Sequence, residues 1–255
     1  MPKTYNIYIS KINFYVIKYN WNYLKTIKLF AIDIDGTITI NGDGAVNLEI
    51  LSKLRYLVKL DYKIVYVTGR SSIEAFILSV FGGTTKISIG ENGGVITKSP
   101  TTHMLLADKE KCMKGYSLLA KEFGDIENKQ VFPRMTEVVL TRTFDIDEGN
   151  RIFNEHNMGL VIVDSNYAFH INELKVNKAF GLKVLLDTIK IKSSEVVVIG
   201  DSETDIPMFD MCENSVTFES SKDKVKNMAK FVVNGEEGEG LINALDLIIR
   251  KKSLG

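Results

Sequence analysis

Short apolar runs alternate with amphipathic stretches along most of the chain, and turn-forming residues separate them. This pattern is typical of βαβ units and predicts an α/β fold with a mainly parallel sheet. In 47–60 the apolar residues recur at helical spacing, so this segment should cover one face of the sheet. Strands are expected at 27–34, 62–67, 86–90, 195–199, 214–218 and 230–233, and helices at 47–60, 71–81, 177–190, 204–211, 221–228 and 239–251.

The alternation changes between about residues 98 and 174. Glycines at 90–94 and Ser99-Pro100 mark the entry to this segment. Inside it we expect two helices and three strands: helices 108–123 and 146–157, and strands 136–143, 159–164 and 167–172. The sequence therefore predicts a small α+β domain at 98–174, inserted into a core formed by 26–97 and 175–255.

The first 25 residues differ in composition from the rest, because Tyr, Asn, Ile and Lys dominate them. They contain neither an uninterrupted apolar stretch nor a small-residue cleavage site, so we do not expect a signal peptide. Two interpretations stay open for 1–25. The segment is either an extra arm or edge strand, or the product of a misplaced start, since the domain pattern begins near Thr26.

The composition narrows the class of protein. In 255 residues, 45% are hydrophobic and 25% charged, which is ordinary for a soluble globular protein. The 32 basic and 32 acidic residues balance, so no basic field is available for nucleic acid or an anionic membrane. Cys112 and Cys212 have no motif spacing, which suits a reducing compartment. No apolar run is long enough to span a bilayer, and we expect a cytoplasmic protein.

Two pairs of acidic residues follow apolar strands. Asp33 and Asp35 come after 27–32, and Asp201 and Asp205 come after 196–199. Because parallel strands end at one edge of the sheet, where ligands bind, the two pairs should meet there. Neighbouring carboxylates repel by about 1 kcal/mol in water and by about 4 kcal/mol at an effective dielectric constant near 20. A hard dication such as Mg²⁺ would relieve this repulsion.

Two further residues complete the pattern. Thr68 ends the strand at 62–67, and Lys178 opens a predicted helix. Each motif alone has an ordinary interpretation, as a strand-end turn or a solvated lysine. A calcium loop starting at Asp33 is excluded, because its sixth position is Ile38 and its twelfth is Gly44. No dinucleotide or Walker-type glycine motif follows any strand. The order and spacing of all four motifs together carry the signal.

With these motifs in this order, the chain from Thr26 onward resembles the haloacid dehalogenase superfamily of phosphohydrolases. The resemblance implies a three-layer, Rossmann-like core and identifies 98–174 with an α/β cap. The segments 90–94 and 235–241 look most like those of the archaeal phosphoglycolate phosphatases and their sucrose-phosphate-phosphatase-like relatives. Glu203-Thr204 before Asp205 is a small departure from the family pattern and does not threaten the metal site.

The resemblance also implies roles for the residues. Asp33 would be the nucleophile and Asp35 the general acid/base, reaching Mg²⁺ through its backbone carbonyl. Thr68 and Lys178 would bind the phosphoryl group. The implied metal ligands are Asp33, Asp35, Asp201 and Asp205. The cap would select small esters, and its polar residues that could face the substrate are Arg134, Glu137, Arg142 and His170.

The implied activity is Mg²⁺-dependent hydrolysis of small phosphomonoesters through an aspartyl-phosphate, with 2-phosphoglycolate as the best single substrate. A sugar-phosphate phosphatase or a phosphomutase of the same superfamily is the alternative among enzymes. A non-catalytic phosphate-binding protein on this fold is the alternative outside them, although Asp35 and Lys178 are both present. The expected partner is a small phosphorylated metabolite, and the expected assembly is a monomer or homodimer.

Overall fold

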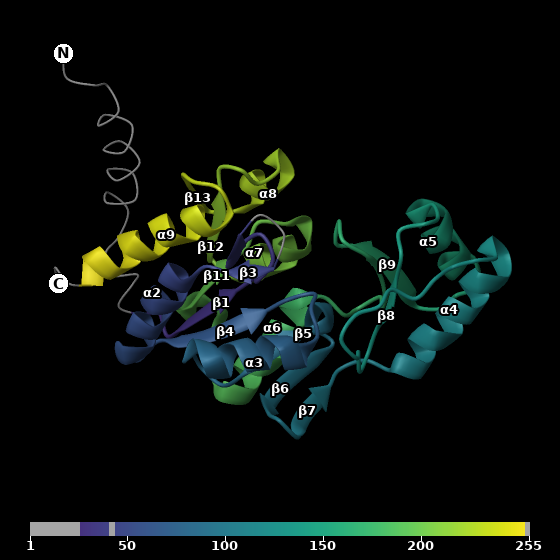
Figure 1. The fold of residues 1–255 in the computed structure, drawn as a ribbon, viewed down its shortest axis with the longest axis horizontal. Coiled ribbons are helices and arrows are strands. Elements are labelled where there is room, and N and C mark those ends of the chain that lie inside the picture. The colour runs from purple at the N-terminus through teal and green to yellow at the C-terminus, as the bar shows by residue number, and fades with distance from the viewer. Residues whose placement is uncertain (1–25, 41–43, 253–255) are drawn as a thin grey trace, which may run out of the picture.

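The computed structural model describes residues 26–40 and 44–252. The segment 1–25, with its two interpretations, lies outside the described residues. Two units are visible in Figure 1: a large unit built around a central sheet, and a small unit to its right. The small unit comprises residues 109–173, and the large unit comprises the rest of the described chain.

An eight-stranded sheet forms the middle layer of the large unit, in the order β13-β12-β11-β1-β4-β5-β6-β7. The strands from β13 to β5 run parallel, and β6 and β7 add an antiparallel hairpin at one edge. The α/β class with a mainly parallel sheet is therefore confirmed. The strands are β1 (Leu29–Ile32), β4 (Lys63–Val67), β5 (Ser88–Gly90), β6 (Val95–Ser99), β7 (Thr102–Leu105), β11 (Val196–Ile199), β12 (Asn214–Phe218) and β13 (Phe231–Val233).

Helices cover both faces of this sheet, which makes three layers (Figure 1). Alternate residues of β1 show why: Phe30 and Ile32 pack on one face, and Leu29 and Ala31 on the other. The first face meets α2 (Leu48–Lys59), α3 (Ser72–Gly82) and α9 (Glu237–Lys252). The second face meets α6 (Lys178–Ile189), α7 (Ile206–Met211) and α8 (Asp223–Met228).

The small unit has its own sheet and its own core. Its strands are ordered β8-β10-β9 and pair antiparallel. The elements are α4 (Lys109–Phe123), β8 (Val138–Leu140), α5 (Ile146–Glu155), β9 (Leu160–Asp164) and β10 (Phe169–Glu173). Leu119, Phe153 and Ile171 belong to a buried apolar cluster formed within this unit. It therefore has the separate core expected of a domain.

The hairpin β6–β7 lies partly inside the range 98–174. Strand β7 pairs with β6 and extends the central sheet, whereas the sheet and helices of the small unit run from Lys109 to Glu173. The domain division into 26–97, 98–174 and 175–255 stays a prediction. A second short hairpin, β2 (Thr39–Ile40) with β3 (Ala45–Val46), follows β1. Within the described ranges, no helix combines the length and apolar character needed to cross a membrane.

Candidate active site

The site lies where three neighbouring strands end. In the register of the sheet, Ile32 of β1 faces both Tyr66 of β4 and Ile199 of β11. The chain leaves β1 at Asp33, whose N–H donates to the carbonyl of Ile199 over 2.9 Å. The segments carrying Asp33, Thr68 and Asp201 therefore start from the same edge of the sheet, as the strand ends of a parallel sheet require.

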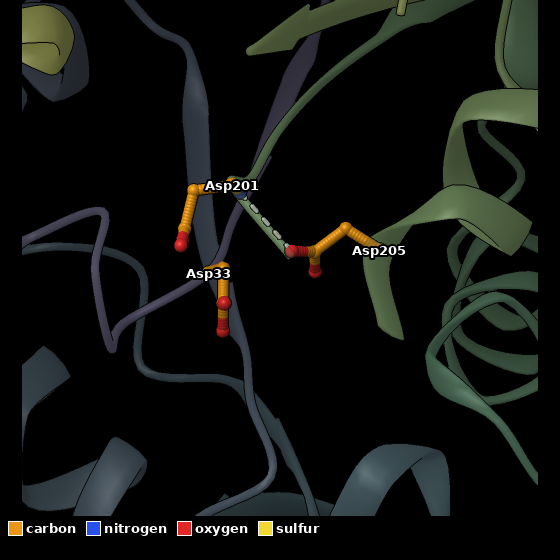
Figure 2. Close-up of side chains that lie close together, drawn as sticks. All are labelled: Asp33, Asp201 and Asp205. Carbon is orange, nitrogen blue, oxygen red and sulfur yellow. Dashed lines mark hydrogen bonds between the residues drawn. The ribbon is translucent and has the colours of Figure 1, made fainter. Parts of the chain in front are cut away.

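Three carboxylates meet at this edge. One oxygen of each of Asp33, Asp201 and Asp205 lies within 4.8 Å of the others. Figure 2 shows the three side chains converging from the ends of β1 and β11 and from the turn before α7. Asp33 and Asp205 are buried, and Asp201 is partly exposed. The fold thus brings together the two acidic pairs that lie far apart in the sequence, apart from Asp35.

Lys178 joins this group from the first position of α6. Its Nζ lies 2.9 Å from Oδ1 of Asp33 and donates to Oδ1 of Asp205 over 2.7 Å. The side chain is 3% exposed, so it is not the solvated lysine that its position alone could suggest. Burial opposes its charge, but Asp205 and Asp33 outweigh that effect and raise the pKa of Lys178. The ammonium is therefore a fixed positive charge in the site.

Asp205 is held by the turn that it ends. Its Oδ2 accepts from the N–H groups of Asp201 and Ser202 over 3.2 and 3.0 Å and from the Ser202 hydroxyl over 2.9 Å. The first of these bonds is dashed in Figure 2. With Lys178 on its other oxygen, Asp205 has one fixed orientation. Asp201 is fixed separately, because the Thr37 hydroxyl donates to its Oδ1 over 2.8 Å.

Crowding of the carboxylates changes their protonation. Burial and the charge of Asp205 raise the pKa of Asp33 well above its ordinary value, even though Lys178 acts in the opposite direction. Burial, with Asp205 next, raises the pKa of Asp201 to about 7. Burial is the larger cause of both shifts, and the negative charge of Asp205 adds to it. A further cation would be bound favourably there.

Glycine is required at the turn that follows Asp33. Gly36 has φ +74°, and a Cβ built on it would lie 2.4 Å from Oδ2 of Asp201. A side chain at this position would therefore occupy space that the Asp201 carboxylate fills. Gly36, in the segment Asp33-Ile34-Asp35-Gly36-Thr37, is thus a condition for closing the acidic cluster.

Asp35 lies apart from the acidic cluster. Its side chain is 50% exposed and is bound by the guanidinium of Arg70, with Nη2 2.6 Å from Oδ1 and Nε 2.9 Å from Oδ2. Asp35 was predicted as a site residue from the sequence, and Arg70 was not. The spacing of the motifs gave no signal that these two side chains would pair.

Thr68 lies at the end of β4 with a fully buried side chain. Its Oγ1 accepts the N–H of Arg70 over 3.0 Å, and its carbonyl accepts the N–H of Asn92 over 3.1 Å. These bonds hold the strand-end turn at 68–70 in place. The hydroxyl can still donate its own proton, because that bond uses it only as an acceptor.

The sequence also named four polar residues of the insert. Three of them gather at the boundary with the large unit. Arg134 Nη1 donates to the carbonyl of Gly69 over 2.7 Å and lies 3.1 Å from Oε1 of Glu137, whose Oε2 is 3.1 Å from Nδ1 of His170. Arg142 instead pairs with Asp164 over 2.7 Å at the surface of the small unit.

A buried glutamate that the sequence analysis did not single out also joins the two units. Glu91, at φ +54°, accepts hydrogen bonds from the N–H groups of Met135 and Thr136 over 2.9 and 2.7 Å and from the Thr136 hydroxyl over 2.8 Å. Burial and the charge of Glu137 raise the pKa of Glu91. Its place within the glycine-rich segment 90–94 was the one available signal.

A parallel α/β sheet with an inserted small unit, and an acidic cluster with a buried lysine at the strand ends, together define a class of protein. The sequence profile of the haloacid dehalogenase-like hydrolases matches residues 30–132 and 121–245, which is most of the chain. The chain belongs to this family. Asp33, Asp201, Asp205 and Lys178 meet at the sheet edge where the sequence predicted the family's motifs to converge.

Relatives of known name extend the comparison. The chain is 46% identical to a phosphoglycolate phosphatase of Nitrosopumilus maritimus over 86% of its own length and 95% of the relative. It is 33% identical to a phosphoglycolate phosphatase of Archaeoglobus fulgidus, over 87% and 96%. The crystal structure of a Thermoplasma acidophilum protein matches with a TM-score of 0.77 at 23% identity, over 88% of this chain and 98% of that one. This last likeness supports the fold alone.

Proposed function

We propose that this protein is a Mg²⁺-dependent phosphatase of small phosphomonoesters and that its substrate is 2-phosphoglycolate. The observation that carries the chemistry is the buried Lys178 ammonium between Asp33 and Asp205, with Asp201 beside them. The substrate is supported by relatives named phosphoglycolate phosphatase that match 95% and 96% of their own lengths. The small phosphorylated metabolite is thus the partner of this site.

The residues present fit a magnesium ion. Carboxylate oxygens are the hard ligands that Mg²⁺ takes in proteins, usually together with water and substrate phosphate. Three carboxylates lie within 4.8 Å of one another and share the single ammonium of Lys178, so a dication would offset charge that the lysine leaves. Asp33, Asp201 and Asp205 would hold it, with the backbone carbonyl of Asp35. When bound, the ion offsets negative charge on the phosphoryl oxygens.

Two carboxylates carry out the reaction in two steps. In the first, an oxygen of Asp33 attacks phosphorus, the bond between phosphorus and the ester oxygen breaks, and Asp35 gives its proton to the leaving alkoxide. In the second, Asp35 takes a proton from water, and the water oxygen attacks phosphorus. The bond to Asp33 then breaks, which releases inorganic phosphate and restores the Asp33 carboxylate and the protonated Asp35.

Lys178 and Thr68 bind the phosphoryl group in this scheme. The ammonium is already fixed by Asp33 and Asp205, so no reorganisation is needed when charge develops on the phosphoryl oxygens. The Thr68 hydroxyl retains a proton to donate. Besides its place at the proposed metal site, Asp205 orients Lys178 through the bond to its Oδ1.

We further propose that the insert at 98–174 acts as the cap that selects small substrates. Arg134, Glu137 and His170 lie at the boundary between the two units, close to the Thr68-Gly69-Arg70 turn. A unit placed over the site excludes water and bulky esters. Arg134 already donates to Gly69 and pairs with Glu137, which argues against it as a free cation for a substrate carboxylate.

Phosphate release from a panel of esters, with Mg²⁺ and with a chelator, tests this proposal. The panel contains 2-phosphoglycolate, several sugar phosphates and 4-nitrophenyl phosphate. Mg²⁺-dependent release that is fastest for 2-phosphoglycolate is the expected result. A sugar phosphate as the favoured ester would move the substrate and keep the chemistry. Release that requires a bisphosphate activator would indicate a mutase, and no release from any ester would leave a binding role.

A further inference from the structure

One ion pair at the edge of the site stands outside the chemistry derived so far. Arg70 encloses the carboxylate of Asp35, with Nη2 2.6 Å and Nε 3.0 Å from Oδ1, and Nε 2.9 Å from Oδ2. A guanidinium that meets both oxygens of a carboxylate fixes its plane as well as its position. We propose that Arg70 is a positioning residue that aims Asp35 for its two proton transfers, an inference that rests on the proposed function.

Asp35 needs such a partner more than the other carboxylates do. Asp33 and Asp205 are buried and held by Lys178, and Asp201 is held by Thr37. The Asp35 side chain, in contrast, is 50% exposed and sits next to the positive-φ turn at Gly36. An exposed aspartate samples several rotamers, and proton transfer requires the one that places its oxygen within hydrogen-bond reach of the ester oxygen.

Arg70 is itself firmly held. Its backbone N–H donates to Thr68 Oγ1 over 3.0 Å, and its carbonyl accepts the N–H of Glu91 over 2.8 Å. On the far side of the guanidinium, Nη1 lies 3.4 Å from Oε1 of Glu74, whose Oε2 caps α3 by accepting the N–H of Ser71. The arginine thus connects Asp35 to the first turn of a helix.

The same turn carries the proposed phosphate ligand. Thr68 and Arg70 are two residues apart, and the N–H of one binds the hydroxyl of the other. One backbone turn therefore sets the distance between the group that binds phosphate and the group that orients the proton donor. This matters because misplacement of a proton donor by about 1 Å can cost on the order of 10²-fold in rate.

A second role for Arg70 must be separated from this one. Since 2-phosphoglycolate carries a carboxylate, Arg70 could leave Asp35 and bind the substrate instead. The two roles differ in which esters they affect. A positioning residue for the acid affects every ester whose leaving group needs a proton, whereas a carboxylate ligand affects only esters that carry a carboxylate.

The test measures the first turnover of Arg70→Ala on three esters in the presence of Mg²⁺. These are 2-phosphoglycolate, ethyl phosphate, which lacks the carboxylate, and 4-nitrophenyl phosphate, whose leaving group departs without a proton. We expect the first turnover of both alkyl esters to fall by about 10²-fold, the scale of general acid catalysis. For 4-nitrophenyl phosphate, a rapid burst of nitrophenolate should persist, followed by slow turnover, because the second step still needs Asp35 as a base.

A double-mutant cycle with Asp35→Asn makes the dependence on Asp35 explicit. If Arg70 acts through Asp35, then Arg70→Ala should change the rate of the Asp35→Asn enzyme by less than about threefold, since coupled residues are not additive. Arg70→Lys should recover part of the rate, because an ammonium supplies charge without the two-pronged geometry. Arg151→Ala, which breaks surface pairs with Glu148 and Glu155 on α5, is the matched control and should keep full activity.

Each other outcome overturns the inference. Equal loss on all three esters, including the burst, would show that Arg70 maintains the site as a whole. Loss confined to 2-phosphoglycolate would assign Arg70 to the substrate carboxylate. Full additivity with Asp35→Asn would show that it acts elsewhere. If the unmodified protein released phosphate from none of the esters, the proposed function would fail, and this inference would fail with it.

Discussion

At the scale of residues, the main feature of the site is that one lysine faces three carboxylates. Lys178 lies 2.9 Å from Asp33 and 2.7 Å from Asp205, and all three side chains are buried. Asp201 adds further negative charge within 4.8 Å. Buried charges of one sign are costly unless they are paired, and here one ammonium faces three carboxylates.

Asp33→Asn removes the proposed nucleophile and one negative charge. We expect kcat for 2-phosphoglycolate to fall by about 10⁴-fold or more, the range found when catalytic nucleophiles are removed. The metal-free protein should be at least as stable as before, because the pKa of Asp33 is raised by burial and by Asp205. Steady-state kinetics and thermal melting in chelator measure both effects. Substantial turnover in pure Asp33→Asn protein would refute the assignment.

Lys178→Met keeps most of the side-chain volume and removes the ammonium. We expect large losses of kcat and a loss of about 3–5 kcal/mol in unfolding free energy without metal, because two buried carboxylates lose their partner. Mg²⁺ should restore part of the stability and little of the activity. Denaturant unfolding with and without Mg²⁺ measures the difference, and Lys183→Met, at an exposed position of the same helix, is the control. Preserved kcat would place Lys178 outside the machinery.

The stability of the metal-free protein should depend on pH through Asp201. Burial and Asp205 raise its pKa from 3.8 to about 7 in the folded protein. A raised acid pKa contributes stability that is fully present below the unfolded value and is lost as the pH rises through the folded one. In chelator, the melting temperature should therefore fall between about pH 4 and pH 7 and level off above pH 7. Asp201→Asn should flatten this profile, and an unchanged slope in that variant would contradict the assignment.

At the scale of elements, the turn after β1 decides whether the acidic cluster can form. The turn bends back so closely that Gly36 touches Asp201, which comes from the end of β11. The backbone of Gly36 therefore packs against the side chain of Asp201, although the two residues lie far apart in the sequence. Such contacts leave no room for a Cβ, and this restricts the residue type more strongly than local turn preferences do.

Gly36→Ala tests this restriction against a matched glycine. Gly124 has a similar φ, +79°, but a Cβ there would meet nothing within 4 Å. Gly124 has φ +79° and ψ −118°, a conformation that L residues rarely adopt, so Gly124→Ala should lose about 1–3 kcal/mol of stability from backbone strain and keep its activity. Gly36→Ala should show the same strain and, in addition, lose Mg²⁺ affinity and kcat. Calorimetric Mg²⁺ titration separates the two, and equal affinities in both variants would show that the contact with Asp201 is unimportant.

The elements of the large unit were largely predictable from the sequence, because most are amphipathic or fully apolar. Helix 47–60 and strand 62–67 correspond to α2 and β4 within a few residues. The hairpin β6–β7 was not predicted. Val95 and Ile96 are buried, but Lys98, Ser99 and Pro100 at the turn look like the start of a linker. Its membership of the central sheet is decided by tertiary pairing with β5.

The candidate site was predictable in part for a similar reason. Asp33, Lys178, Asp201 and Asp205 follow strands or open helices, and strand ends converge in a parallel sheet. The partner of Asp35 was not predictable, because pairing with Arg70 depends on side-chain directions in two exposed turns. The burial of Glu91 depends on a neighbouring unit whose placement the sequence does not reveal.

At the scale of the whole molecule, Glu91 is the main polar contact from the large unit to the segment 135–136 of the small unit. We expect Glu91→Gln to raise KM and to speed amide hydrogen exchange at Met135 and Thr136, because an amide keeps one acceptor oxygen and adds an unwanted donor. Hydrogen exchange read by mass spectrometry measures this. Glu110→Gln, at an exposed position of α4, is the control. Unchanged exchange at 135–136 would show that Glu91 does not hold the two units together.

The chain passes between the two units twice, at 106–108 and at 174–177. These crossings are tied to each other, because Glu173 accepts the N–H of Asp108 over 2.9 Å and pairs with Lys111 over 3.0 Å. The two crossings thus form one narrow connection, beside the contacts that Glu91 and Arg134 make between the units. The second crossing ends at Asn177, which caps α6 one residue before Lys178. A displacement of the small unit about this connection would therefore reach the start of α6, and with it Lys178, through only a few residues of chain.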